Sequence, residues 1–145
     1  MKADDLLGAI VANVYNLLII ALFAARLSGR PRLEYGLGLA AMVLVVPIVY
    51  LLVRAFSTNR PVLYFVQLGL MVVFQLVELF GDYILDIDFR SVRWMTIVYV
   101  MLFFGATGGM MGVASHAGKG WTAVTATTFL LMAGLAFYQR AKTGL

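Results

Sequence analysis

Residues 62–81 read VLYFVQLGLMVVFQLVELFG, and this stretch decides the fold class. At a helical rise of about 1.5 Å per residue, it is long enough to cross a hydrocarbon core roughly 30 Å thick. It lacks the alternation of apolar and polar residues that is typical of strands in membrane barrels. In lipid, backbone amides and carbonyls must be hydrogen-bonded within their own segment. The stretch is therefore predicted to be a transmembrane helix.

The rest of the chain repeats this pattern. Hydrophobic residues make up 63% of the sequence and charged residues 12%, with a mean hydropathy of +0.95, whereas soluble domains have about twice that share of charge. Short connections separate the apolar runs and leave no soluble domain. We predict an all-α integral membrane protein with one domain over residues 1–145, a compact bundle of five transmembrane helices with short loops. The other four spans are approximately 6–27, 35–53, 94–115 and 121–138.

The basic residues predict an orientation in the cell membrane, because cytoplasmic loops carry an excess of lysine and arginine. Alternate loops of a five-span protein lie on opposite sides. One set carries Arg26, Arg30, Arg32, Arg90, Arg93, Arg140 and Lys142, and the other carries Lys2, Arg54, Arg60 and Lys119. We therefore expect a multi-pass protein with its N-terminus outside and its C-terminus in the cytoplasm. Because these charges are spread among loops, they do not indicate nucleic-acid binding.

Glu78 is the acidic residue inside an apolar span, in the stretch from Gln75 to Asp88. A carboxylate at membrane depth is costly and marks a candidate functional site. Gln75, Glu78 and Asp82 are three and four residues apart, which places them on one helical face. Such a pair of acids could bind a cation or exchange a proton. The alternative is that Glu78 only pairs with another helix, while Asp86 and Asp88 belong to a solvated turn.

Span one and span two each contain a residue that is unusual at membrane depth. Asn13 and Asn16 lie near the middle of span one. Amide side chains often hydrogen-bond across membrane helices, so the asparagines either link two helices or face Glu78 in a polar cavity. Pro47 in span two lacks a backbone donor and crowds the carbonyl of Val43, which predicts a kink.

Span four carries a glycine pattern that favours close helix packing. Four-residue pairs of small residues form a smooth groove that another helix can approach. We expect residues 121–138 to be the neighbour, with a dimer contact as the competing use. The glycines are Gly105, Gly108, Gly109 and Gly112.

The sequence also argues against several chemistries. There is no cysteine, which excludes thiol redox chemistry and thiolate metal sites. The single histidine, His116, lies at the end of a span, on the side opposite to the acidic stretch. No catalytic set can be assembled from these residues, and the spacing of the acids lacks the pattern of a calcium loop. We predict no enzyme, no metal site and no cofactor.

Three functions remain open. The first is an oligomeric transporter or channel for protons or ions that uses Glu78 and Asp82, and it predicts a water-accessible cavity beside Glu78. The second is an accessory or scaffolding subunit that packs against other membrane subunits through the glycine face of span four. The third is a binder of a lipid-like ligand, with a lateral opening lined by aromatic residues such as Tyr15, Phe65, Phe74 and Phe80. In each case the expected partners are the lipid bilayer and either a second copy of the chain or other subunits.

Overall fold

A computed structural model describes residues 3–85 and 91–144, and all of its regular elements are helices. Most of them are α-helices, and one short segment is a π-helix. They are α1 (Ala3–Leu27), α2 (Pro31–Val43), α3 (Val45–Ser57), α4 (Val62–Glu78), η1 (Leu79–Ile84), α5 (Arg93–Ser115) and α6 (Lys119–Thr143). The all-helical prediction is thus confirmed for the described residues.

Among the described residues, five helices are long and apolar enough to span a membrane. Helices α1, α5 and α6 each supply one, α2 and α3 together form Pro31–Ser57, and α4 and η1 together form Val62–Ile84. Each contains one of the predicted apolar runs. The helices extend a few residues beyond these runs because polar residues at the ends continue the helical hydrogen bonding.

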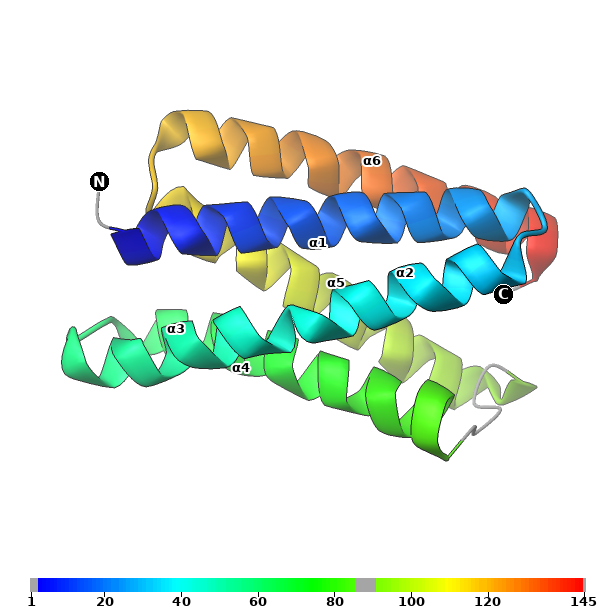
Figure 1. The fold of residues 1–145 in the computed structure, drawn as a ribbon, viewed down its shortest axis with the longest axis horizontal. Helices are drawn as coiled ribbons and strands as arrows, with labels where there is room; N and C mark the ends of the chain where they lie inside the picture. The colour runs from blue at the N-terminus through cyan, green and yellow to red at the C-terminus, as the bar shows by residue number, and fades with distance from the viewer. Residues whose placement is uncertain (1–2, 86–90, 145) are drawn as a thin grey trace.

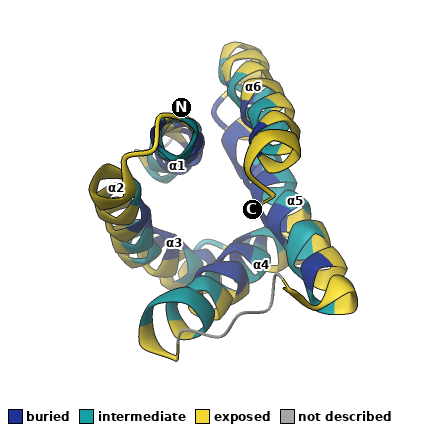
Figure 2. Cartoon of the chain, turned by 90° about the vertical axis from the view of Figure 1, so that its right-hand side faces the viewer, coloured by how far each residue is buried: buried dark blue, intermediate teal, exposed yellow. Residues whose placement is uncertain are grey.

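The five spans form a ring when the bundle is viewed from one end (Figure 2). Each span packs against the next one along the chain, and α6 returns to pack against α1 (Figure 1). Helix α1 also contacts α3 and α5, so both α1 and α5 pack against three other spans. At the end where α1 finishes, the start of α2 and the C-terminal end of α6 also lie close by.

Large apolar side chains occupy both the inside and the outside of this ring. Tyr15, Met71 and Phe74 lie in the core and are at most 1% exposed, whereas Phe56 and Val62, on the outer surface, are more than 70% exposed. A water-soluble protein rarely exposes apolar side chains in such continuous patches. The outer surface is therefore suited to contact with lipid chains.

The second span is broken at Leu44, which separates α2 from α3. Pro47 lies three residues later, and its ring would collide with the carbonyl oxygen of Val43 in a regular helix. The chain responds with a tighter turn, in which the amide of Leu44 donates to the carbonyl of Ala41 at 3.2 Å. The predicted kink at Pro47 is confirmed.

The third span changes its helical geometry after Glu78. From Leu79 to Ile84 the chain forms a π-helix, in which hydrogen bonds join residues five apart. The amide of Leu85 continues this pattern by donating to the carbonyl of Phe80 at 2.9 Å. The wider turn changes the direction of the side chains that follow Glu78. Asp86 and Asp88, predicted to form a surface turn, lie outside the described residues.

Two ion pairs join the N-terminal end of α1 to the last turn of α3 and to the connection between α3 and α4. Arg54 lies 3.1 Å from Asp4, and Arg60 lies 2.6 Å from Asp5. The guanidinium of Arg60 also covers the ring of Tyr64, 4.8 Å from its centroid. Because the side chains of Asp5 and Arg60 are only about a tenth exposed, this pair fastens the end of the bundle more firmly than the surface pair at Arg54 does.

Candidate functional site

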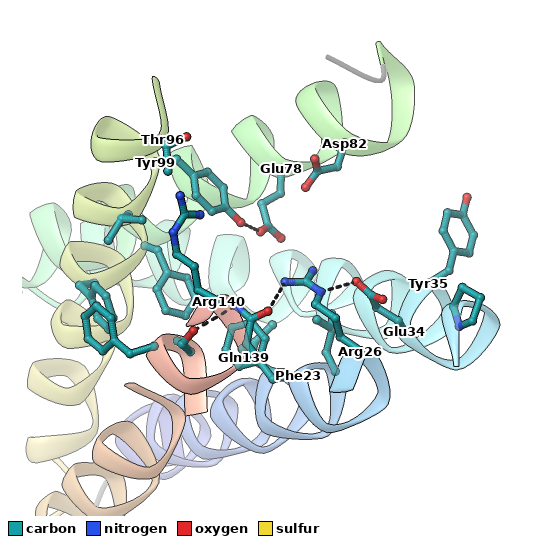
Figure 3. Close-up of a pocket in the computed structure, with 18 of the residues that line it drawn as sticks. Phe23, Arg26, Glu34, Tyr35, Glu78, Asp82, Thr96, Tyr99, Gln139 and Arg140 are labelled. Atoms are coloured by element: carbon teal, nitrogen blue, oxygen red, sulfur yellow. Dashed lines mark hydrogen bonds and ion pairs between the residues drawn. The ribbon is translucent and has the colours of Figure 1, made fainter. Parts of the chain in front are cut away.

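A cavity of about 320 Å³ lies at the opposite end of the bundle, and all five spans contribute to its wall (Figure 3). Its inner part is apolar and includes Ile19 and Phe23 from α1 and Phe103 and Phe104 from α5. Six charged or amide side chains also line it, together with tyrosines and further apolar residues. The charged and amide residues are Arg26, Glu34, Glu78, Asp82, Gln139 and Arg140.

Glu78 lies half-buried on the wall of this cavity, at the last residue of α4. The hydroxyl of Tyr99 in α5 donates a hydrogen bond to the Oε1 atom of Glu78. The ring of Tyr99 in turn packs against the buried ring of Phe74, with centroids 5.5 Å apart. Since Tyr99 is held by its ring, its hydroxyl can keep the carboxylate of Glu78 in a defined position. Tyr99 was not among the predicted site residues.

The π-helix η1 supplies two further residues, Asp82 and Tyr83. The ring of Tyr83 packs against the ring of Tyr35 in α2, with centroids 5.2 Å apart. The hydroxyl of Tyr83 rests on Gly38, where even a methyl group would overlap it. These contacts close the seam between α2 and η1. They bring Asp82 to the same cavity as Glu78, as the spacing of the two acids predicts.

Arg26 connects three helices on the other side of the cavity. Its Nε atom lies 2.7 Å from the Oε1 atom of Glu34, and its Nη1 atom donates to the Oε1 atom of Gln139 at 3.1 Å. Its guanidinium also lies 5.7 Å from the centroid of the Phe23 ring. Arg26 is therefore held in place by α1, α2 and α6 together. The sequence analysis used Arg26 only to predict the orientation in the membrane and did not predict it as a site residue.

Arg140 is the second arginine of the cavity, and it lies in the last turn of α6. It is exposed, and within residues 3–85 and 91–144 it forms no ion pair. Its neighbour Gln139 is buried and contacts Arg26. The end of α6 thus presents one amide that is engaged with the protein and one guanidinium that is available to a bound molecule.

Comparisons of the chain with protein-family models, with curated proteins and with solved structures find no match. In the part of the chain that the structure describes, no group of three His, Cys, Asp or Glu residues could hold a metal ion. The function is therefore inferred from the cavity and its lining.

Gln75 was predicted to share a face with Glu78 and Asp82, but it does not line the cavity. Its side chain is fully buried, and its Nε2 atom donates to the carbonyl oxygen of Ala41 at 2.9 Å. Ala41 lies just before the break at Leu44, and its carbonyl oxygen accepts hydrogen bonds both from the amide of Leu44 and from Gln75. Gln75 therefore fastens α4 to the broken span, and the predicted polar stripe contributes only its two acids to the cavity.

Asn13 and Asn16 link α1 to α6 and do not line the cavity with Glu78. The Nδ2 atom of Asn13 donates to the hydroxyl oxygen of Thr125 at 2.8 Å, and that of Asn16 donates to the hydroxyl oxygen of Thr128 at 3.0 Å. The hydroxyl of Thr128 also donates to the Oδ1 atom of Asn13. The interpretation that placed them opposite Glu78 is wrong, because their hydrogen bonds are directed to the threonines of α6.

The glycines of α5 face a different neighbour from the one predicted. Gly109 and Gly112 pack against Gln67 of α4, and not against α6. The backbone and side chain of Gln67 approach so closely that a methyl group on Gly112 would overlap its amide. Gly105 and Gly108 have no side chain within 4 Å of the position a methyl group would take. Helix α4 thus fills the half of the groove at Gly109 and Gly112. Without side chains on these two glycines, the long side chain of Gln67 has room to lie against α5.

Proposed function

We propose that this protein is a small carrier of the cell membrane, acting as an oligomer, that binds its substrate in the cavity and exchanges a proton or cation at Glu78 and Asp82. The observation that carries the proposal is the cavity beside Glu78. Its volume of about 320 Å³ lies at the lower end of the range for small-molecule sites, roughly 300–1,000 Å³. Carboxylates within a membrane span commonly mark substrate, ion or proton pathways.

The floor of the cavity favours a carrier over an open channel. The ring of Phe103 lies on this floor, and it packs against Phe23 and against the fully buried Phe74, at centroid distances of 6.5 Å and 5.4 Å. A pore through a single chain would require this aromatic contact to separate. A carrier needs access to its site from only one side at a time. By the predicted orientation, the cavity opens toward the cytoplasm.

Two interruptions of regular helix support a change of conformation around the site. The π-helix η1 forms one wall, and π-helical turns occur frequently at functional sites. The break at Leu44 divides the second span, whose first half, α2, forms another part of the wall. Broken helices at membrane depth are also typical of transporter binding sites.

Flux into proteoliposomes tests the carrier function. The chain would be reconstituted as wild type and as Glu78→Gln, Asp82→Asn and Asp4→Asn variants, and proton and cation flux would be measured. Loss of flux in the two cavity variants is expected. Asp4→Asn is the matched control, because it also removes one carboxylate but lies at the opposite end of the bundle, and it should keep its flux. Equal flux in all four proteins, or none in any, would contradict the proposal.

An accessory subunit is the second candidate function, supported by the open half of the glycine face at Gly105 and Gly108. Such a subunit would be isolated together with other proteins, whereas the proposed carrier would be isolated as an assembly of identical chains. The mass of the complex in a mild detergent separates these two outcomes, and a lone monomer would count against both.

The hypothesis of a lipid-like ligand has less support from the arrangement of the aromatic residues. Tyr15 and Phe74 are enclosed in the core, and Phe65 packs against Phe56 at a centroid distance of 4.9 Å. They do not line a common lateral opening with Phe80. Phe80 lines a separate apolar cavity of about 310 Å³ together with Trp94 and Tyr99, whereas Phe23 and Phe103 line the cavity that holds Glu78.

A further inference from the structure

The charged residues of the cavity lie on two different walls. Glu78 and Asp82 come from α4 and η1, whereas Arg26 and Arg140 come from α1 and α6. Helix α5 lies between α4 and α6 in the ring, so these two walls are held apart by the fold (Figure 2). In Figure 3 the acids project from one side of the cavity and Arg26 lies on the other. A bound molecule would therefore meet carboxylates that come from α4 and η1 and guanidinium groups that come from α1 and α6, with the Arg140 side chain extending toward Tyr99 in Figure 3.

The two arginines differ in how much of their charge is already compensated. Arg26 forms an ion pair with Glu34 and a hydrogen bond with Gln139. Arg140 forms no ion pair with any residue that the structure describes. An anionic group in the cavity would consequently gain most from Arg140. Guanidinium groups bind carboxylates through two parallel hydrogen bonds, which makes them selective for such groups.

The aromatic residues that line the cavity, from the buried Phe103 to Phe137, which is 63% exposed, are suited to contact with an aromatic ring. Phe104 stacks on Phe137 with centroids 5.5 Å apart and planes 18° apart, and Phe103 packs edge-on against Phe104. All three line the cavity. Ring pairs in offset-stacked or edge-on arrangements contribute beyond the apolar area that they bury. A ligand with an aromatic body could extend this cluster, whereas a bare ion would leave it unused.

From these three features we propose that the ligand is a zwitterion with an aromatic body, of the class of aromatic amino acids. The ammonium group contacts Glu78 and Asp82, the acid group contacts Arg140, and the ring packs against the cavity-lining faces of Phe103 and Phe104. This inference rests on the proposed use of the cavity as a binding site. A zwitterion enters such a cavity at lower cost than a single ion, because each of its charges finds a group of opposite sign.

Three probes of the same ring and similar length test the class of ligand. L-phenylalanine carries both charges, phenethylamine lacks the carboxylate, and 3-phenylpropionate lacks the amine. Their affinities for the purified full-length protein in detergent would be measured by equilibrium dialysis. We expect L-phenylalanine to bind about tenfold more tightly than either of the other two, because each loses one charge-assisted contact.

Variants of the two walls connect this preference to named residues. The Glu78→Gln variant loses the partner of the ammonium group, so it should bind L-phenylalanine no more tightly than it binds 3-phenylpropionate. The Arg140→Gln variant loses the partner of the carboxylate, so it should bind L-phenylalanine no more tightly than it binds phenethylamine. Arg32→Gln is the matched control, because Arg32 is also an exposed arginine but does not line the cavity. Since Arg140 is exposed and forms no ion pair among the described residues, its variant should fold, and Arg140→Lys should recover part of the affinity.

Several results would overturn the proposal. Equal affinity for the three probes would mean that the cavity recognises the ring alone, and tightest binding of phenethylamine or of 3-phenylpropionate would mean a site for one charge. A lipid headgroup can also carry an ammonium and an acid group, so short-chain phosphatidylethanolamine is a fourth probe. Its binding more tightly than L-phenylalanine would replace the amino acid by a lipid.

The ligand class and the carrier function can fail separately. Selective binding of L-phenylalanine without flux in proteoliposomes would support the ligand class and contradict the carrier. Proton or cation flux that depends on Glu78, without binding of L-phenylalanine, would support the carrier and contradict the ligand class.

Discussion

Tyr99 of α5 donates a hydrogen bond to Glu78 at the end of α4, so the acidic residue predicted to lie within an apolar span is held by a neighbouring helix at the wall of a cavity. This contact satisfies both interpretations of Glu78 that the sequence left open. It is a pairing between two helices, and it also keeps a carboxylate oriented beside a space that can hold a small molecule.

Removing the hydroxyl of Tyr99 should weaken both roles. Tyr99→Phe keeps the ring that packs on Phe74 but loses the donor to Glu78, and hydrogen bonds to charged groups contribute about 1.5–3 kcal/mol. We expect a loss of about 1–2 kcal/mol in unfolding free energy, together with reduced flux. Unfolding in denaturing detergent and proteoliposome flux measure the two effects. Tyr50→Phe, at an exposed tyrosine, is the control, and equal losses in both variants would refute the prediction.

The contact between Gly38 and Tyr83 should be sensitive to a single methyl group. Gly38→Ala places that group where the hydroxyl of Tyr83 lies, which should push the Tyr83 ring out of position and destabilise the protein by about 1–3 kcal/mol. Thermal unfolding in detergent measures this loss. Gly36→Ala, two residues earlier in the same helix, meets nothing within 4 Å and should be neutral or slightly stabilising.

A second substitution shows whether the Tyr83 hydroxyl is the cause. The double variant Gly38→Ala with Tyr83→Phe should recover part of the lost stability, because it removes the overlapping atom. If the double variant is as unstable as the sum of the two single variants, the contact is not the source of the effect.

The glycines of α5 should divide into two pairs. Gly112→Ala should destabilise the bundle by about 1–3 kcal/mol, because its methyl group overlaps the amide of Gln67. Gly108→Ala has open space and should be tolerated. Unfolding midpoints in denaturing detergent test the difference. Recovery of Gly112→Ala by Gln67→Ala is expected, and equal sensitivity at both glycines would disagree with the packing of α4 on α5.

Asn13 should matter for stability but not for flux. Asn13→Ala removes hydrogen bonds to Thr125 and Thr128, and such contacts between membrane helices average about 0.6 kcal/mol, with a maximum near 1.7 kcal/mol. A double-mutant cycle with Thr125→Ala should give a coupling energy in this range. Flux in proteoliposomes should remain close to wild type, because Asn13 does not line the cavity. A large loss of flux with unchanged stability would return Asn13 to the functional site.

Some features of the site could be predicted because they depend on neighbours in the sequence. The position of Glu78 and Asp82 on the wall of one cavity follows from their spacing in one span, and the kink in the second span follows from Pro47 alone. The face containing Gln75 could not be predicted in the same way. The side chain of Gln75 donates to the carbonyl oxygen of Ala41 on another helix, next to the break at Leu44. A regular helical projection contains no information about an acceptor on a different span.

The sequence by itself determined the helical spans, because lipid requires each segment to satisfy its own backbone hydrogen bonds and apolar composition is a local property. The partners of the polar side chains were decided only by the tertiary structure. Tyr99 and Glu78 are 21 residues apart, Asn13 and Thr125 are 112 apart, and Arg26 and Gln139 are 113 apart. Which of them meet depends on the order of the helices in the ring and on the rotation of each helix about its axis. Close packing of whole helix faces sets that rotation, and it leaves no periodic trace in the sequence of a single span.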